Sequence, residues 1–92
     1  MEELRERLNI IDGQILELFL ARMRIAKEIG YYKKENGMPV EDKTRENEII
    51  TRMCLGADPE AAYYIRDFFE ELIALSKDVQ RAIEDGEKPA EF

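Results

Sequence analysis

Three polar residues occupy positions where the apolar pattern of a helix calls for an apolar side chain. Arg22 lies midway between Ile15 and Ile29 in a seven-residue series. Ser76 and Gln80 are four residues apart, so they share one face of a helix. Burying a charge or an amide is costly unless the group finds a partner. A guanidinium, a hydroxyl and an amide on core-facing stripes therefore indicate a polar pocket inside a bundle of helices.

Each of the three has a simpler structural explanation when it is taken alone. A seam Arg most often pairs with a buried carboxylate or extends its charged head to solvent. Ser fits many helix interfaces, and a single amide such as Gln80 can specify helix register. The functional interpretation therefore depends on the whole set of polar residues.

The residue types that are missing exclude several mechanisms. The chain has no His and only one Cys, Cys54. A Ser-His-Asp triad, a Cys-His pair and a zinc site of His and Cys are excluded. We expect no metal and no internal disulfide, because a single Cys cannot form one.

Charge and hydropathy set further limits on partners and location. The 92 residues include 14 Lys and Arg against 21 Asp and Glu, a formal charge of -7. This balance repels a phosphate backbone, so nucleic acid is not expected as a partner. The first residues are charged where a signal peptide is apolar, and no apolar run approaches the ~18 residues of a membrane span. We predict a cytoplasmic protein with no membrane segment.

The apolar pattern predicts an all-α protein of three helices, over about residues 3–36, 42–55 and 59–85, with a frayed tail over 86–92. Apolar residues recur at spacings of three and four up to residues 36–39, Asn-Gly-Met-Pro, which favour a helix end. Asp42 is the expected N-cap of the second helix, and Asp58 with Pro59 begins the third. With no linker or repeat between them, residues 1–92 are expected to form one domain.

The first predicted helix is longer than the domain that contains it. About 32 residues at 1.5 Å each span ~48 Å, whereas a compact chain of this length is roughly 32 Å across. The apolar stripe continues along the overhanging half, so another surface must cover it. A second copy of the chain is the simplest partner, and we predict an intertwined homodimeric helical bundle.

Over residues 4–83 the chain resembles the all-helical (type II) class of chorismate mutases. The residues that carry the resemblance are Arg5, Asp12, Arg22, Gly30, Lys33, Pro39, Val40, Asp42, Arg45, Glu46, Ser76 and Gln80. Every polar position that the family uses at its site holds the expected residue type. The resemblance implies an isomerase that rearranges chorismate to prephenate in phenylalanine and tyrosine biosynthesis. This pericyclic (Claisen) step requires no nucleophile and no cofactor.

The resemblance also implies roles for these side chains. Arg22, together with an Arg5 donated across the dimer interface, would hold the two substrate carboxylates with help from Ser76. Lys33 and Gln80 would donate to the ether oxygen, on which negative charge grows as the carbon–oxygen bond lengthens. Catalysis would consist of conformational restriction and electrostatic stabilisation.

On the second predicted helix, Glu46 and the backbone at Asp42 would bind the ring hydroxyl, with Arg45 supporting Glu46. This intact pattern argues against the nearest alternative, an isochorismate-pyruvate lyase on the same scaffold. A non-catalytic helical dimerisation or regulatory module is a further alternative, which predicts loss of the seam Arg or of the Lys33 and Gln80 pair. The sequence leaves open whether the 92 residues stand alone or belong to a bifunctional chain, for example one with prephenate dehydratase.

Overall fold

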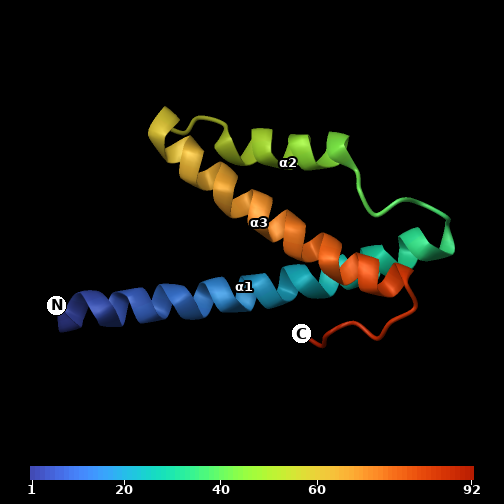
Figure 1. The fold of residues 1–92 in the computed structure, drawn as a ribbon. Helices are drawn as coiled ribbons and strands as arrows, with labels where there is room; N and C mark the ends of the chain where they lie inside the picture. The colour runs from blue at the N-terminus through green and yellow to red at the C-terminus, as the bar shows by residue number, and fades with distance from the viewer.

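The computed structural model describes residues 1–92 as three α-helices without a strand, α1 (Glu2–Glu35), α2 (Lys43–Cys54) and α3 (Pro59–Glu84) (Figure 1). The all-α prediction is confirmed, and each observed helix end lies within one residue of the predicted one. The tail that follows α3 is not helical and turns back along α1, where Lys27 Nζ lies 6.0 Å from the centroid of the Phe92 ring.

Short polar segments fix the helix ends as the sequence predicts. Asp42 is the N-cap of α2, and its Oδ1 accepts a hydrogen bond from the Arg45 amide at 3.1 Å. Asp58 caps α3 in the same way, with Pro59 in the first turn. Beyond the end of α1, Gly37 adopts a φ of +64°, which a residue without Cβ reaches at little cost. Local chemistry therefore sets where the chain reverses direction.

The helices form an open arrangement in which α3 is the central element. The C-terminal half of α1 crosses the C-terminal half of α3, and α2 packs against the rest of α3 (Figure 1). No residue of α2 comes within 8 Å of α1, measured between Cα atoms. The buried apolar residues gather along α3 and its two contacts, and are Met23, Ala26, Val40, Ile50, Ile73 and Ile83.

At Gly30, α1 and α3 pack tightly against each other. A Cβ added there would lie 3.0 Å from Ile83 Cδ1, 3.1 Å from Gln80 Cγ and 3.3 Å from Gln80 Cα. Ordinary carbon–carbon contacts are about 3.5 to 4.0 Å. Gly at this position lets α3 approach the α1 backbone, and this approach brings Gln80 against α1.

The N-terminal half of α1 extends away from the other helices (Figure 1). The molecule measures 50 Å along its longest axis and 13 Å along its shortest. The overhang predicted from helix length is confirmed. The apolar stripe on this half is exposed, with Leu4 57%, Leu8 55%, Ile11 49%, Ile15 47% and Leu18 72% accessible. None of the three helices has the length and hydropathy that a membrane crossing requires.

Candidate active site

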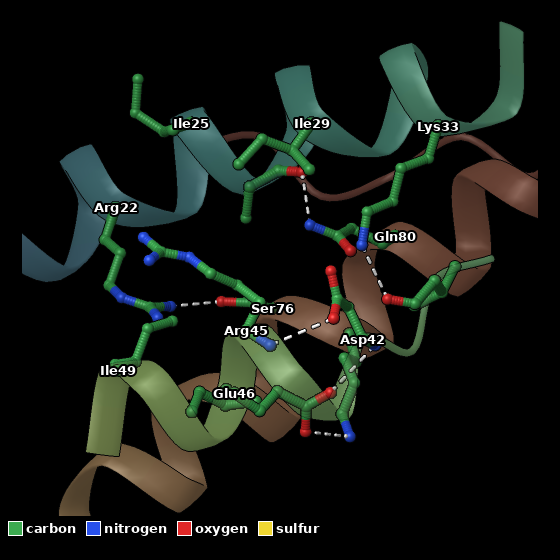
Figure 2. Close-up of a pocket in the computed structure, with 14 residues that line it drawn as sticks. Arg22, Ile25, Ile29, Lys33, Asp42, Arg45, Glu46, Ile49, Ser76 and Gln80 are labelled. Atoms are coloured by element: carbon green, nitrogen blue, oxygen red, sulfur yellow. Dashed lines mark hydrogen bonds and ion pairs between the residues drawn. The ribbon is translucent and has the colours of Figure 1, made fainter. Parts of the chain in front are cut away.

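A cavity of about 290 Å³ lies between the three helices, open on one side (Figure 2). Seven of the eight predicted site residues line it, and they are Arg22, Lys33, Asp42, Arg45, Glu46, Ser76 and Gln80. Its other walls are largely apolar side chains, among them Ile25, Ile29, Ile49 and Ile73. The fold thus brings together polar residues that are up to 58 positions apart in the sequence, from 22 to 80.

Arg22 lies at one end of the cavity on α1 (Figure 2). Its Nη1 donates to Ser76 Oγ and to the Leu72 carbonyl, the latter at 3.4 Å. No carboxylate lies within ion-pair distance of Arg22, so the simpler explanation of a buried ion pair does not hold. Burial lowers the pKa of the Arg22 guanidinium below its ordinary value, because desolvation disfavours the charge. The arrangement leaves a part-buried cation available to an anionic ligand.

Lys33 lies near the other end, 11 residues further along α1, which corresponds to about 16 Å of helix. Ile25 and Ile29 stand between the two cations (Figure 2). Lys33 Nζ donates to the Val40 carbonyl at 2.8 Å. An ammonium has three donors, so this bond fixes the head of Lys33 and leaves two N–H groups for a ligand.

Gln80 and Ser76 supply the polar groups of the α3 wall, and both are buried, at 7% and 8% exposure. Gln80 Nε2 donates to the Ala26 carbonyl at 3.1 Å across the helix crossing. A carboxamide nitrogen carries two N–H groups, so one remains for a ligand in the cavity. Ser76 Oγ donates to the Leu72 carbonyl at 2.9 Å and accepts from Arg22, so its hydroxyl orients the guanidinium.

The first turn of α2 forms the third wall. Asp42 accepts from the Arg45 amide, and its own amide donates to Glu46 Oε2 at 3.2 Å, so the two carboxylates hold the start of the helix reciprocally. The expected support of Glu46 by Arg45 stays a prediction: both residues line the cavity, and Arg45 Nη1 pairs with Glu48 at 3.6 Å in this structure. Adjacent helical residues point in different directions, whereas residues three apart face each other.

Lys77 is the cation that pairs with Glu46 in the structure, and sequence reasoning missed it. Its Nζ lies 3.0 Å from Glu46 Oε1, and its side chain lines the cavity. The available signal was its position three residues before Gln80, but a single Lys beside a seam resembles a solvated surface charge. With Lys77 included, four cations and two carboxylates line the cavity, a formal excess of two positive charges among the lining residues.

Arg5 does not reach the cavity of its own chain. It lies in the exposed N-terminal part of α1, where its Nη1 pairs with Glu2 at 3.4 Å. Figure 1 shows this end of α1 far from the helix crossing. Asp12 occupies the same extended half of the helix and is also exposed. Any role of these two residues in a site requires another subunit.

Comparison with known proteins indicates the family of the chain. The family model for chorismate mutase type II matches residues 4–81. Over 53 residues the chain is 34% identical to a chorismate mutase from Methanocaldococcus jannaschii, covering 58% of this chain and 54% of that protein. Over 77 residues it is 30% identical to a 3-dehydroquinate dehydratase from Pyrobaculum aerophilum, covering 84% of this chain and 23% of that protein.

A solved structure shares the fold and much of the sequence. It is a conserved hypothetical protein from Pyrococcus furiosus, with a TM-score of 0.73 and 40% identity, covering 87% of this chain and 93% of the other. The chain spans about half the length of the M. jannaschii relative and about a quarter of the P. aerophilum relative. Since the family model covers most of the chain, the protein belongs to the type II chorismate mutase family.

Proposed function

We propose that this chain catalyses the intramolecular rearrangement of chorismate to prephenate. The observation that carries the proposal is the cavity itself, where Arg22 without a carboxylate partner faces Lys33 and Gln80 across apolar walls. The substrate is a dianion with an ether bridge between its two reacting parts. The excess of two positive charges among the lining residues matches that charge.

One substrate carboxylate would bind at Arg22. The planar guanidinium matches the two oxygens of a carboxylate, and Ser76 already holds Nη1 in place. The remaining N–H groups of Arg22 are directed at no carboxylate of the chain. An arriving anion would supply the counter-charge that the empty cavity does not provide.

The ether oxygen would lie between Lys33 and Gln80. Negative charge grows on this oxygen as the carbon–oxygen bond lengthens, so donors fixed beforehand stabilise the transition state more than the ground state. Both donors are fixed through main-chain carbonyls, Lys33 by Val40 and Gln80 by Ala26. The apolar walls would hold the flexible substrate in the compact conformer that reacts.

The ring hydroxyl would bind at Glu46 and at the backbone of Asp42. A carboxylate has about four acceptor positions. Lys77 occupies one at 3.0 Å and the Asp42 amide another at 3.2 Å, so Glu46 keeps acceptor capacity. Arg45, which also lines the cavity, would add positive potential above the substrate.

Arg5 would complete the site from a second subunit within an intertwined homodimer. Two observations support this proposal, namely the uncovered apolar stripe on the N-terminal half of α1 and the position of Arg5 on that same half. Residues 1–92 would then work as a single chorismate mutase domain that makes two sites per dimer. The second carboxylate of the substrate would meet the partner's Arg5.

The first experiment incubates the purified protein with chorismate and follows the loss of ultraviolet absorbance, with the product identified by NMR. Prephenate is the expected product. Pyruvate released from isochorismate, without any prephenate from chorismate, would favour the lyase. No reaction with either compound would leave a non-catalytic helical module and refute the proposal.

Substitution of Arg22 or Lys33 by Ala is the matching test of the site. Each change is expected to lower kcat/KM by at least about 10²-fold, the usual loss for one preorganised donor. Arg24→Ala, on an exposed turn of α1 outside the cavity, is the control and should retain activity. Unchanged turnover in the Arg22 and Lys33 variants would remove these residues from the mechanism.

A further inference from the structure

Lys77 connects three parts of the molecule through its ammonium group. Its Nζ lies 3.0 Å from Glu46 Oε1 in the first turn of α2 and 3.6 Å from Glu41 Oε1 in the segment between α1 and α2. The Lys77 side chain is 19% exposed and that of Glu46 is 21% exposed. Ion pairs that are largely shielded from water are screened less by salt than surface pairs are.

The position of α2 depends on such connections because no Cα atom of α2 lies within 8 Å of a Cα atom of α1. Lys33 is on α1, whereas Glu46 is on α2. Their relative placement is therefore transmitted through α3 and through the connecting segment. Only one residue of α2, Ile50, is buried, so apolar packing alone anchors this helix weakly.

Two lysines from different helices hold consecutive residues of the connecting segment. Lys33 of α1 donates to the carbonyl of Val40, and Lys77 of α3 pairs with the carboxylate of Glu41. The same Lys77 pairs with Glu46, whose other oxygen accepts from the Asp42 amide. These contacts link α3 to α2 and to the connecting segment. The carbonyl of Val40 in that segment accepts the hydrogen bond from Lys33.

We propose that Lys77 is a positioning residue for the mutase reaction, holding the Glu46 carboxylate at the correct distance from Lys33 and Gln80. This inference rests on the proposed function. Without the ammonium, Glu46 would lose its only ion-pair partner and turn toward water. The negative charge of Glu46, no longer neutralised by Lys77, would also repel a dianionic substrate.

The test is a double-mutant cycle of Lys77→Gln and Glu46→Gln, with kcat and KM measured for all four proteins. Lys77→Gln alone is expected to raise KM about tenfold with a smaller change in kcat, because Glu46 contacts the substrate in both the ground state and the transition state. In the Glu46→Gln background the same change should alter kcat/KM less than about twofold. Lys77→Arg, which keeps the charge, should recover most of the loss.

Additive losses in the cycle would overturn the proposal, since they would mean that Lys77 acts on the substrate directly or not through Glu46. Lys88→Gln is the matched control, because Lys88 also forms an ion pair, with Glu91 at 3.9 Å, in the exposed tail. This control should leave kcat and KM unchanged.

Thermal unfolding of the same four proteins without ligand distinguishes a failure of this inference from a failure of the proposed function. Non-additive changes in Tm are expected if Lys77 and Glu46 stabilise each other, and additive changes would contradict the pairing itself. Inactive wild-type protein would refute the proposed function, whatever the Tm values show. Active wild-type protein with an additive kinetic cycle would refute only the role of Lys77.

Discussion

The Arg22 side chain, which would bind the substrate, is expected to destabilise the folded protein in the absence of ligand. Its guanidinium is partly buried, hydrogen-bonded to a hydroxyl and a carbonyl, and without any carboxylate in reach. Removing a charge from water is costly unless an opposite charge compensates for it. The folded chain therefore retains a partly desolvated cation for which it supplies no counter-charge of its own, and a ligand can supply one.

Replacing Arg22 by Leu is expected to stabilise the empty protein while abolishing turnover. The gain in the free energy of unfolding should be about 1 kcal/mol, measured by urea unfolding without ligand. Ser76 keeps its hydrogen bond to the Leu72 carbonyl, so the change leaves no orphaned buried group. Arg24→Leu on the exposed side is the control. A clear loss of stability in the Arg22 variant would show that the cation is structural.

The lowered pKa of Arg22 also determines how its contribution to stability changes with pH. Folding disfavours the protonated form, so the destabilising contribution is fully present at neutral pH. It disappears only in strongly alkaline solution, as the pH rises from the folded-state pKa toward the ordinary arginine value. The difference in stability between wild type and Arg22→Leu should therefore be constant between about pH 6 and 8.

Gln80→Glu is expected to make activity depend on pH. A carboxyl group donates to the ether oxygen only while it is protonated, whereas the wild-type amide has no proton to lose. Position 80 is 7% exposed, and burial raises the pKa of a carboxyl group introduced there. Activity of the variant should fall as the pH rises through that pKa, measured as kcat/KM against pH. A profile parallel to that of the wild type would exclude Gln80 as the donor.

Among single residues, the sequence reveals those that violate an apolar pattern. Arg22, Ser76 and Gln80 stand out because each interrupts a stripe, and all three reach the cavity. Lys77 could not be found in this way, because its importance depends on Glu46, which is 31 positions away in the sequence. The cation that pairs with Glu46 in the structure is Lys77, because adjacent residues of a helix such as Arg45 and Glu46 point in different directions.

At the scale of the elements, the crossing of α1 and α3 has no room for a side chain at Gly30. Gly30→Ala would introduce a Cβ at 3.0 Å to 3.3 Å from Ile83 and Gln80 atoms, one of them the Gln80 Cα. A side-chain end can rotate, but a backbone atom moves only with its helix. The substitution must therefore shift α3 and carry the Gln80 amide away from its position.

We expect Gly30→Ala to lower both the Tm and kcat, although Ala is the better helix former by about 1 kcal/mol. Thermal unfolding and steady-state kinetics would measure the two effects. The same change at Gly13, where an added Cβ meets nothing within 4 Å of the chain, is the control and should not reduce kcat. Equal behaviour of the two variants would mean that the crossing has room for a methyl group.

Element boundaries could be predicted well because local signals determine them. Asp42 and Asp58 cap their helices through side-chain bonds within three residues, and Pro59 begins α3. The arrangement of the helices could not be predicted in the same way. That the backbone of α2 approaches α3 and not α1 depends on packing between distant segments, which no short window of sequence encodes.

At the scale of the whole molecule, the overhang of α1 follows from the fixed rise of a helix, and the sequence was sufficient to predict it. The longest dimension of 50 Å agrees with a helix of 34 residues. The sequence also predicts that a second copy covers the exposed stripe. That prediction specifies a partner but not the geometry of the contact, which depends on two surfaces fitting together.

Mixed dimers test whether Arg5 acts across the subunit interface. Arg5→Ala and Lys33→Ala chains should each be inactive alone. The two variants are mixed in equal amounts, unfolded and refolded. Half of the resulting dimers would contain one chain of each kind, and each such dimer would have one intact site. The mixture should then recover about a quarter of the wild-type activity. If both variants are inactive alone and the mixture also stays inactive, Arg5 serves its own subunit. Activity of Arg5→Ala alone would show that Arg5 does not serve the site.

The attachment of α2 to α3 alone has a consequence for how the protein fluctuates. An element with a single buried residue, Ile50, and one neighbouring helix opens at a lower free energy than the crossing of α1 and α3. Its amide protons should therefore exchange with solvent before those of the crossing. A bound ligand that touches α1 and α2 together would bridge two helices whose backbones do not approach each other closely. Ligand occupancy would thus suppress this local unfolding by mass action, and α2 would be the part of the chain most protected by substrate.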